Sequence, residues 1–458
     1  MAPTLQKHEQ ELQLTLACLL GQQVTPDAWT QACLPGPLSG IGMHRPGTTT
    51  DGAMWASWLT TRALCQTLSH ELRAPAYPDQ PPAEVREAQQ RLEEHGVWTS
   101  EAGDAGLTEN AAQHVAEAPW IEECAAARHC PASKQPTHRL LGRITGYRHQ
   151  IAAAALWRRM SDQEDKDRMQ AAAGRQTGGT WTAPLVGTTQ TLSNGHWRMA
   201  TQQRLGTLQV PTNVQCAMQK ARGCACRHLI DPRGFHCMLC KAGPSRMRPH
   251  RCVVSSLTRI CRRAGAHVDI ERAIPELAVW DGQKCQEAIM DAVICWPGRL
   301  QQHLVDATIR CPHAVRYAPQ EDSTERAEGE KHHRYGESVW PLAFTSYGRL
   351  GAEGVHLMEL LAAEAREAAG TYDTQRSVVA AWRTELERSL LYATADSALQ
   401  ALGIRGCSVW DGQAAVKLGA VLAGGAGADF AVEAEELRRQ QCDAACMRSA
   451  ASSASPGS

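Results

Sequence analysis

The sequence predicts a mixed α+β protein, and three of its features lead to this fold class. Apolar side chains recur at helical spacing through much of residues 1–205. Short apolar runs typical of strands alternate with helical stretches between residues 250 and 375. Cysteines and basic residues are concentrated between these two parts. A chain of 458 residues, 43% of them hydrophobic, is large enough for roughly two to four domains with buried cores.

The N-terminal region, residues 1–205, is predicted to be mainly helical. Leucines give an apolar helix face within residues 1–75, and a proline-rich linker follows at residues 73–85. A further long helix is predicted over Tyr147–Ala173. Ser161 and Glu164 have the spacing of a capping box, which predicts that this helix breaks near residue 161.

The segment 250–375 is predicted to form one α/β domain. Its expected helices and strands alternate in the order helix, three strands, helix, strand, helix. Their ranges are Val253–Ala264, Ala266–Ile270, Glu287–Trp296, His303–Cys311, Glu321–Tyr335, Val339–Tyr347 and Ala352–Ala369. Residues 376–458 are predicted to be a helical extension, with a helix over Ser377–Leu402 and a disordered tail from Ser449.

Composition also indicates where the protein works. The first residues lack the apolar run of a signal peptide, and no apolar stretch reaches the ~20 residues that span a bilayer. Without a secretory signal, the 18 cysteines are expected to be reduced thiols or metal ligands. We therefore expect an intracellular protein that does not enter membranes.

The segment 206–249 is predicted to be a small zinc knuckle. Two short ligand pairs lie about ten residues apart, a spacing typical of a tetrahedral structural zinc site. The preferred ligands are Cys224, Cys226, His236 and Cys240. Cys237 is an alternative to His236, and the further candidates are Cys216, His250 and Cys252. The competing interpretation is a set of buried free thiols.

Positive charge is concentrated in and after this knuckle. Residues 220–263 contain eleven Lys and Arg and one acid, whereas the whole chain has a net charge of −1. Clustered cations attract nucleic-acid phosphates. The predicted phosphate contacts are Arg227, Arg246, Arg248 and Arg251. A solvated basic face is the alternative.

Acidic residues interrupt two of the predicted strands. Asp291 and Asp306 each lie within an apolar run, where a carboxylate is costly to bury unless it is paired or bound to metal. Glu271 follows the first strand, and Lys331 lies on the next helix. Hydrolysis of a phosphodiester with a divalent metal requires such oxygen ligands and a nearby cation. The alternative is that the aspartates lie at strand ends in ordinary ion pairs.

Taken in order, these residues resemble part of a known polyprotein family. They are similar to the region downstream of the polymerase in non-LTR retrotransposon polyproteins, where a Cys/His knuckle precedes a PD-(D/E)XK restriction-enzyme-like endonuclease. The matching blocks are Leu34–Gly42, Ala53–Trp58, Arg168–Trp181, His196–Gly206, Cys224–Cys240, Arg251–Glu271, Met290–Ile294, Val305–Ile309, Lys331–Tyr335 and Pro341–Gly351. The sequence contains no F/YxDD polymerase motif.

The resemblance implies a restriction-endonuclease-like αβββαβ core that nicks DNA and leaves a 3′ hydroxyl. Asp291 and Asp306 would bind Mg²⁺, Lys331 would orient water or neutralise charge, and Glu271 would assist the metal site. Thr308 and Tyr335 would support these groups.

The resemblance also implies that DNA is the partner, that element RNA is a further partner, and that the protein is nuclear. Two departures are present: Met290 stands where the family prefers proline, and Thr308 stands where it has lysine. A non-catalytic zinc-containing nucleic-acid-binding protein and a decayed element fragment are the alternatives.

Overall fold

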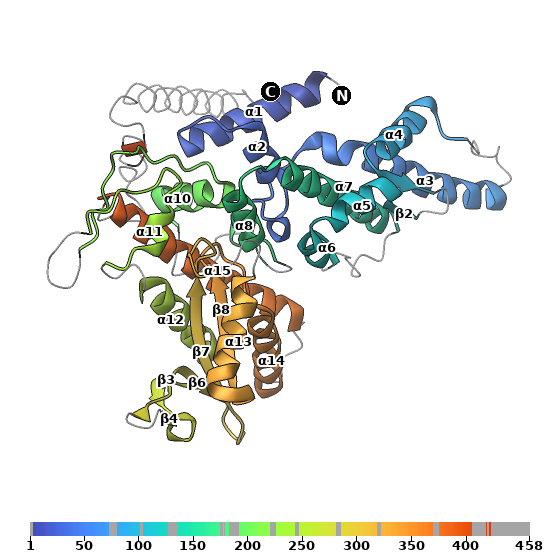
Figure 1. The fold of residues 1–458 in the computed structure, drawn as a ribbon. Coiled ribbons are helices and arrows are strands. Elements are labelled where there is room, and N and C mark those ends of the chain that lie inside the picture. The colour runs from blue at the N-terminus through green and yellow to red at the C-terminus, as the bar shows by residue number, and fades with distance from the viewer. Residues whose placement is uncertain are drawn as a thin grey trace, which may run out of the picture.

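The computed structural model describes residues 3–72, 80–100, 104–126, 136–174, 177, 179–182, 192–219, 226–242, 247–280, 285–317, 322–369, 375–404, 418 and 421–422. Within these residues the chain is mixed α+β, as predicted. An N-terminal helical body lies above a body built on a four-stranded sheet in Figure 1. The predicted disordered tail from Ser449 lies outside the described residues.

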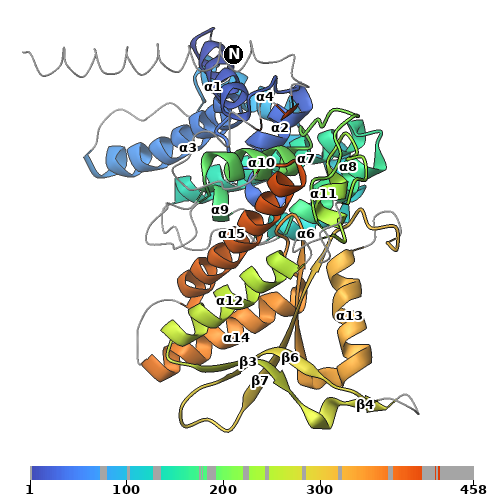
Figure 2. The same ribbon diagram turned by 90° about the vertical axis from the view of Figure 1, so that its left-hand side faces the viewer.

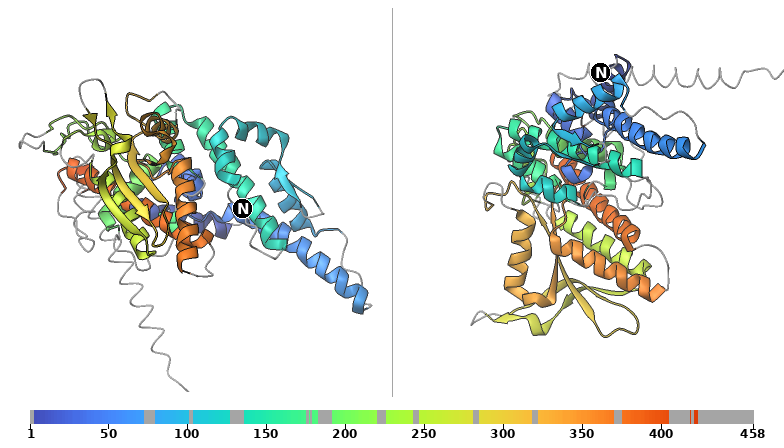
Figure 3. Two further views of the ribbon diagram at one scale, coloured as in Figure 1. Left: turned by 90° about the horizontal axis from the view of Figure 1, so that it is seen from below. Right: turned by 90° about the vertical axis from the view of Figure 1, so that its right-hand side faces the viewer.

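The helical body contains ten α-helices and one short hairpin within the described part of residues 3–205. They are α1 (Pro3–Leu20), α2 (Pro26–Cys33), α3 (Pro46–Leu72), α4 (Ala83–Glu94), β1 (Val97–Thr99), β2 (Ala105–Leu107), α5 (Glu109–Ala116), α6 (Pro119–Ala126), α7 (Pro136–Arg159), α8 (Gln163–Ala172), α9 (Gly179–Thr182) and α10 (Asn194–Leu205). This body extends to one side of the sheet, as the left view of Figure 3 shows.

The second body has the predicted order of helices and strands. It consists of α12 (Met247–Arg263), β3 (His267–Ala273), β6 (Ile289–Cys295), β7 (Gln302–Arg310), α13 (Ser323–Tyr335), β8 (Val339–Thr345), α14 (Ala352–Ala369) and α15 (Gln375–Ala401). A small hairpin, β4 (Val279–Trp280) and β5 (Cys285–Gln286), is inserted between β3 and β6, and the short helix α11 (Phe235–Leu239) precedes α12. The strand order is β3-β6-β7-β8, with only β7 and β8 parallel.

Alternation along the strands gives this sheet two different faces. Ala292 and Ile294 of β6 and Val305 and Ala307 of β7 belong to the core under α12, α14 and α15. Val293 and Leu304, which point the other way, belong to a smaller core that includes Tyr335 of α13. Figure 2 shows α13 alone on its side of the sheet, opposite α12, α14 and α15.

The predicted break in the long central helix is also present, one residue later than expected. α7 ends at Arg159, and α8 begins after Asp162, whose side chain accepts a hydrogen bond from the Glu164 amide at 2.9 Å. Asp162 is therefore the N-cap in place of Ser161, because an aspartate binds the amides of a first turn at least as well as a serine. None of the described helices is long and apolar enough to cross a bilayer.

Helix α15 connects the two bodies. Its first half contributes Val379, Leu386 and Leu390 to the core of the sheet. Its second half contributes Ala395 and Leu399, among others, to a separate core formed with α10 and the knuckle. Residue 376, where a separate helical extension was predicted to begin, lies in the first turn of α15, and the side chains of this helix belong to both cores.

A buried guanidinium also ties the helical body to the sheet. Arg204 is 1% exposed and donates to the carbonyl oxygens of Gly40, Gly36, Ala172 and Tyr347 at 2.9–3.2 Å. Three of these acceptors lie in the helical body, and Tyr347 lies just after β8. A neutral side chain here would leave several buried carbonyls without donors.

Substitution of Arg204 by lysine should destabilise the protein by about 3 kcal/mol. An ammonium group cannot reach all four carbonyl oxygens, and a buried carbonyl oxygen without a hydrogen-bond donor is unfavourable. Chemical denaturation monitored by tryptophan fluorescence measures the change. Arg158→Lys, on the surface of α7, is the matched control. Equal stability of both variants would contradict the role given to Arg204.

Candidate metal centres

Asp291 and Asp306 face each other across two neighbouring strands. β6 and β7 are antiparallel and pair Ala292 with Val305, so Asp291 and Asp306 are the next opposed positions. Asp306 points to the α13 side, since it lies between Val305 and Ala307, which belong to the core under α12 and α14. Asp291 lies between Met290, which belongs to the core with Tyr335, and Ala292, which belongs to the core under α12. The two carboxyl groups lie close enough for each to shift the pKa of the other through a direct side-chain contact.

Helix α13 brings a cation to this pair. Lys331 Nζ lies 2.5 Å from Asp306 Oδ2, and the lysine side chain is 18% exposed. One turn later on the same helix, the buried Tyr335 lies beneath this ammonium, with Nζ 5.9 Å from the ring centroid. The four-residue spacing of Ala327, Lys331 and Tyr335 gives α13 one face toward the carboxylates.

A histidine not predicted at this site holds the other carboxylate. His250, in the first turn of α12, has its Nε2 3.0 Å from Asp291 Oδ2. The same oxygen accepts a hydrogen bond from the Ala307 amide at 2.7 Å. His250 was a candidate zinc ligand from the sequence; in the structure it belongs to the carboxylate site instead.

The charges of this site influence one another strongly. Burial raises the pKa of Asp306 above its usual range, Asp291 raises it further, and Lys331 only partly offsets the two. Burial also acts to raise the pKa of Asp291, but the bonds from His250 and the Ala307 amide outweigh it, so that pKa is lowered. The bond to Asp291 raises the pKa of His250. Two opposed carboxylates with such unequal pKa values favour a shared proton or a shared cation.

Glu271 and Thr308 take more peripheral positions. Glu271 is exposed, has a backbone φ of 52°, and makes none of the hydrogen bonds that link Asp291, Asp306, Lys331 and His250. Thr308 is half-buried, two residues beyond Asp306 on the same strand, and so shares its face of the sheet. Among the described residues, the carboxylate site therefore consists of Asp291, Asp306, Lys331, His250 and Tyr335.

A second group of ligand-type side chains lies in the knuckle. Cys216, Cys226, His236 and Cys240 have their sulfur and nitrogen atoms all within 4.8 Å of one another. The Cys216–Cys240 and Cys226–Cys240 sulfurs are 3.8 and 3.7 Å apart, and Cys226 Sγ is 3.6 Å from His236 Nε2. Zinc–sulfur bonds of about 2.3 Å in a tetrahedron place sulfurs about 3.8 Å apart, so the group fits a metal ion of this kind.

The backbone brings these four ligands together. The Cys216 amide donates to His228, and the Cys226 amide donates to Met218, so two strand-like segments carry Cys216 and Cys226 side by side. His236 and Cys240 follow from α11. Asp231 fixes the start of that helix by accepting from the amides of Arg233, Phe235 and His236 at 2.7–3.1 Å.

The protonation preferences of the knuckle also fit a metal. Burial raises the pKa of Cys216 to about 12 and also raises that of Cys240, so these thiolates require a nearby cation. Burial lowers the pKa of His236, which keeps its imidazole in the neutral form that binds metal. The Ala242 amide donates to Cys240 Sγ at 3.4 Å, as it would to a thiolate.

Three of the four predicted ligands belong to this group of described residues. Cys226, His236 and Cys240 are confirmed as members of the group, Cys216 is the fourth, and Cys224 lies outside the described residues. Cys237 is fully buried among apolar side chains and is not part of the group, so it does not replace His236. Cys252 is half-buried on α12, away from the four ligands.

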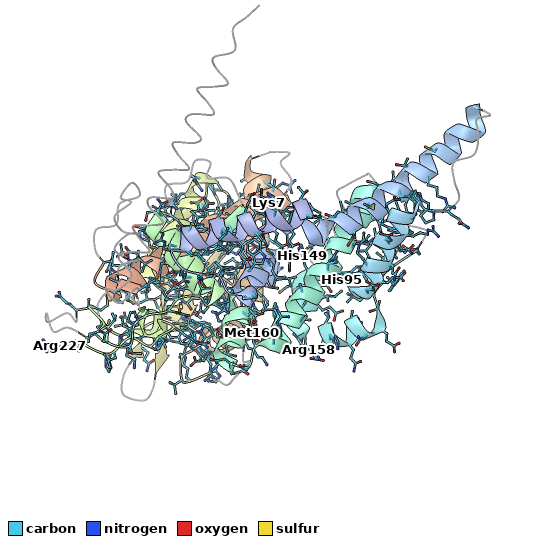
Figure 4. The ribbon with its side chains drawn as sticks, turned by 90° about the horizontal axis from the view of Figure 1, so that it is seen from above. Lys7, His95, His149, Arg158, Met160 and Arg227 are labelled. Carbon is cyan, nitrogen blue, oxygen red and sulfur yellow. The ribbon has the colours of Figure 1, made fainter. Side chains whose placement is uncertain are left out.

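The predicted phosphate-binding arginines have different environments. Arg251 is exposed, and Arg227 is an exposed residue at the outer edge of the molecule in Figure 4. Arg248 is instead paired with Asp396 of α15. Arg246 lies outside the described residues. Arg227 and Arg251 therefore remain accessible to a large anionic partner.

Comparison of the chain with protein-family models, with curated proteins and with solved structures gives no match. Function must therefore be inferred from the two sites themselves.

Proposed function

We propose that this protein is a divalent-metal-dependent DNA endonuclease of the restriction-enzyme-like class, with a zinc-stabilised knuckle. The observation that carries the proposal is the proximity of Asp291 and Asp306 on the neighbouring strands β6 and β7, with Lys331 bonded to Asp306. The αβββαβ order of α12, β3, β6, β7, α13 and β8 agrees with the resemblance to retrotransposon endonucleases.

The two aspartates would hold the metal ion. Hard carboxylate oxygens are the ligands that Mg²⁺ prefers. Burial, and to a smaller extent repulsion from Asp291, raises the pKa of Asp306, and a cation between the two aspartates would relieve both effects. When bound, such an ion polarises a phosphoryl oxygen and makes water more acidic. Thr308, on the same face, would support this arrangement.

Lys331 would supply the positive charge that the reaction needs. Its ammonium lies beside Asp306 and can orient a water molecule or neutralise the charge that develops on the phosphate. In the reaction, the oxygen of water forms a bond to phosphorus while the bond from phosphorus to the 3′ oxygen breaks. That oxygen takes up a proton, so the products carry 5′-phosphate and 3′-hydroxyl ends. Tyr335, packed beneath the ammonium, restricts its position.

Zinc, held by Cys216, Cys226, His236 and Cys240, would have a structural role, because four protein ligands leave no position for substrate. Arg227 and Arg251, which are exposed, are available to DNA phosphates. A DNA substrate also favours the nuclear location that the resemblance implies.

Incubation of the zinc-loaded protein with supercoiled plasmid tests this function. We expect relaxed, singly nicked circles with added Mg²⁺ or Mn²⁺ and none when the added metal is omitted. Omission is preferable to a chelator, which would also remove zinc. A DNA ligase should reseal the nicks, because ligation requires a 5′ phosphate beside a 3′ hydroxyl. A wild-type protein that binds plasmid but nicks it with neither metal would instead support a non-catalytic nucleic-acid-binding role.

A further inference from the structure

The carboxylate oxygens at the candidate nuclease site are not equivalent. Asp291 Oδ2 receives two hydrogen bonds, from His250 Nε2 at 3.0 Å and from the Ala307 amide at 2.7 Å. Asp306 Oδ2 receives the Lys331 ammonium at 2.5 Å. His250, the Ala307 amide and Lys331 therefore all engage Oδ2, so Oδ1 is the oxygen that these three donors leave for a shared cation.

The two donors on Asp291 restrict its carboxylate in different ways. The Ala307 amide belongs to the neighbouring strand and fixes one oxygen at the sheet. His250 approaches from α12, so its bond prevents the carboxylate from rotating about the bond that joins it to the chain. Because a carboxylate only accepts hydrogen bonds, the contact requires a proton on Nε2. A nitrogen that donates this proton has no lone pair for a metal ion.

We propose that His250 is a positioning residue, which holds Asp291 with Oδ1 directed toward the divalent cation without itself binding the ion. This inference rests on the proposed function, since it requires the ion to be bound by Asp291 and Asp306. Carboxylates that ligate metals are commonly held by such hydrogen bonds, and their loss weakens metal binding.

The position of His250 is itself fixed by the helices around it. α12 packs along α15, with a hydrogen bond between Ser256 Oγ and Ser389 Oγ at 2.6 Å. Two residues before the histidine, Arg248 is paired with Asp396, which also contacts the buried His196 of α10. These contacts hold the first turn of α12 relative to β6. The imidazole is thus preorganised for Asp291.

Binding of Mn²⁺ to the zinc-loaded full-length protein tests this role without relying on catalysis. Free Mn²⁺ is measured by electron paramagnetic resonance during titration. His250→Leu removes the donor and keeps a side chain of similar bulk, and His250→Gln supplies an N–H donor that can reach Asp291. His333→Leu is the control, because His333 is an exposed histidine of α13.

We expect His250→Leu to weaken Mn²⁺ binding by about 10- to 100-fold. His250→Gln should stay within about threefold of the wild type, because it restores the donor. His333→Leu should not change the affinity. If His250→Leu binds Mn²⁺ as tightly as the wild type, His250 does not position Asp291. If His250→Gln binds as weakly as His250→Leu, the imidazole acts in another way, such as direct ligation, and the inference is wrong.

The same titration separates this inference from the proposed function. Wild-type protein that binds Mn²⁺ no better than Asp306→Asn would overturn both proposals. Wild-type protein that binds Mn²⁺ through Asp306 and nicks plasmid, while His250→Leu retains full affinity, would overturn the positioning role alone. Zinc content and thermal melting of each variant show whether the fold is retained. If His250→Gln restores Mn²⁺ binding, the weaker binding of His250→Leu is due to the missing donor and not to unfolding.

Discussion

Replacement of Asp306 by asparagine is expected to lower plasmid nicking by about 10³-fold or more, because it removes a metal-binding oxygen and the charge that pairs with Lys331. Asparagine has nearly the same shape as aspartate, so packing between β7 and α13 should be preserved. The substitution also removes the cost of burying the charged carboxylate, which is the main reason that the pKa of Asp306 is raised, and the smaller repulsion from Asp291. This gain offsets part of the lost ion pair, and we expect a melting temperature within about 4 °C of the wild type.

Single-turnover nicking and DNA binding should be measured on the same preparation. Asp269→Asn is the matched control, because Asp269 is a partly exposed aspartate of β3 that pairs with Arg272 and lies outside the candidate site. Binding of DNA without divalent metal should be unchanged in both variants. A nicking rate for Asp306→Asn near that of Asp269→Asn would show that the observed cleavage does not use the Asp291–Asp306 pair.

Much of the sheet could be predicted because its strands have strong patterns. β6 and β7 are apolar runs of the usual strand length, each interrupted by one aspartate, and the Pro297–Gly298 turn joins them. Once the two strands are antiparallel neighbours, their register brings the two carboxylates close to each other. The position of Lys331 at this site could be predicted from helical spacing and from the resemblance. This part of the site depends on local patterns that a sequence records directly.

His250 could not be found in this way. It is adjacent in sequence to the knuckle, where histidines are natural candidates for zinc, and its partner Asp291 is 41 residues away. Its contact depends on how α12 lies across the sheet, which is set by packing against α15 rather than by local sequence. The available signal was its position shortly before the predicted helix Val253–Ala264, which precedes the first strand.

Arg204 and Cys216 illustrate the same limit. In the sequence Arg204 is an ordinary basic residue, and only the assembled fold shows its four carbonyl partners. Cys216 lies ten residues before Cys226, whereas the CxC spacing of Cys224 and Cys226 is a stronger local pattern. The hydrogen bonds that pair residues 214–218 with 226–230 bring Cys216 into the group, and these bonds are not encoded in cysteine spacing.

Removal of one knuckle ligand is expected to have the largest effect on stability. Cys216→Ala should reduce the zinc content from about one ion per chain to near zero, because three ligands bind zinc far more weakly than four. We expect a loss of at least about 4 kcal/mol, or about 10 °C in melting temperature. Metal analysis by mass spectrometry and differential scanning calorimetry measure the two quantities.

Cys237→Ala is a closely matched control for this variant. Cys237 and Cys216 are both buried thiols of the same apolar core, but only Cys216 belongs to the metal group. Cys237→Ala should therefore retain zinc and lose only about 1 kcal/mol, the transfer free energy of one small apolar group. If Cys216→Ala retains zinc while Cys224→Ala loses it, the ligand pair predicted from local spacing is the correct one.

The effect of zinc loss should extend beyond the knuckle, because α15 belongs to two cores. Ala395 and Leu399 pack with Cys216 and Cys240, whereas Leu386 and Leu390 of the same helix pack under the sheet. A knuckle without metal loses the contacts that hold the end of α15, and Asp396 on that end holds Arg248 at the start of α12. Cys216→Ala should therefore also increase amide hydrogen exchange in α12 and reduce nicking, even though its substitution is outside the carboxylate site. Exchange in α12 that is unchanged by loss of zinc would mean that the knuckle and the sheet are stabilised independently.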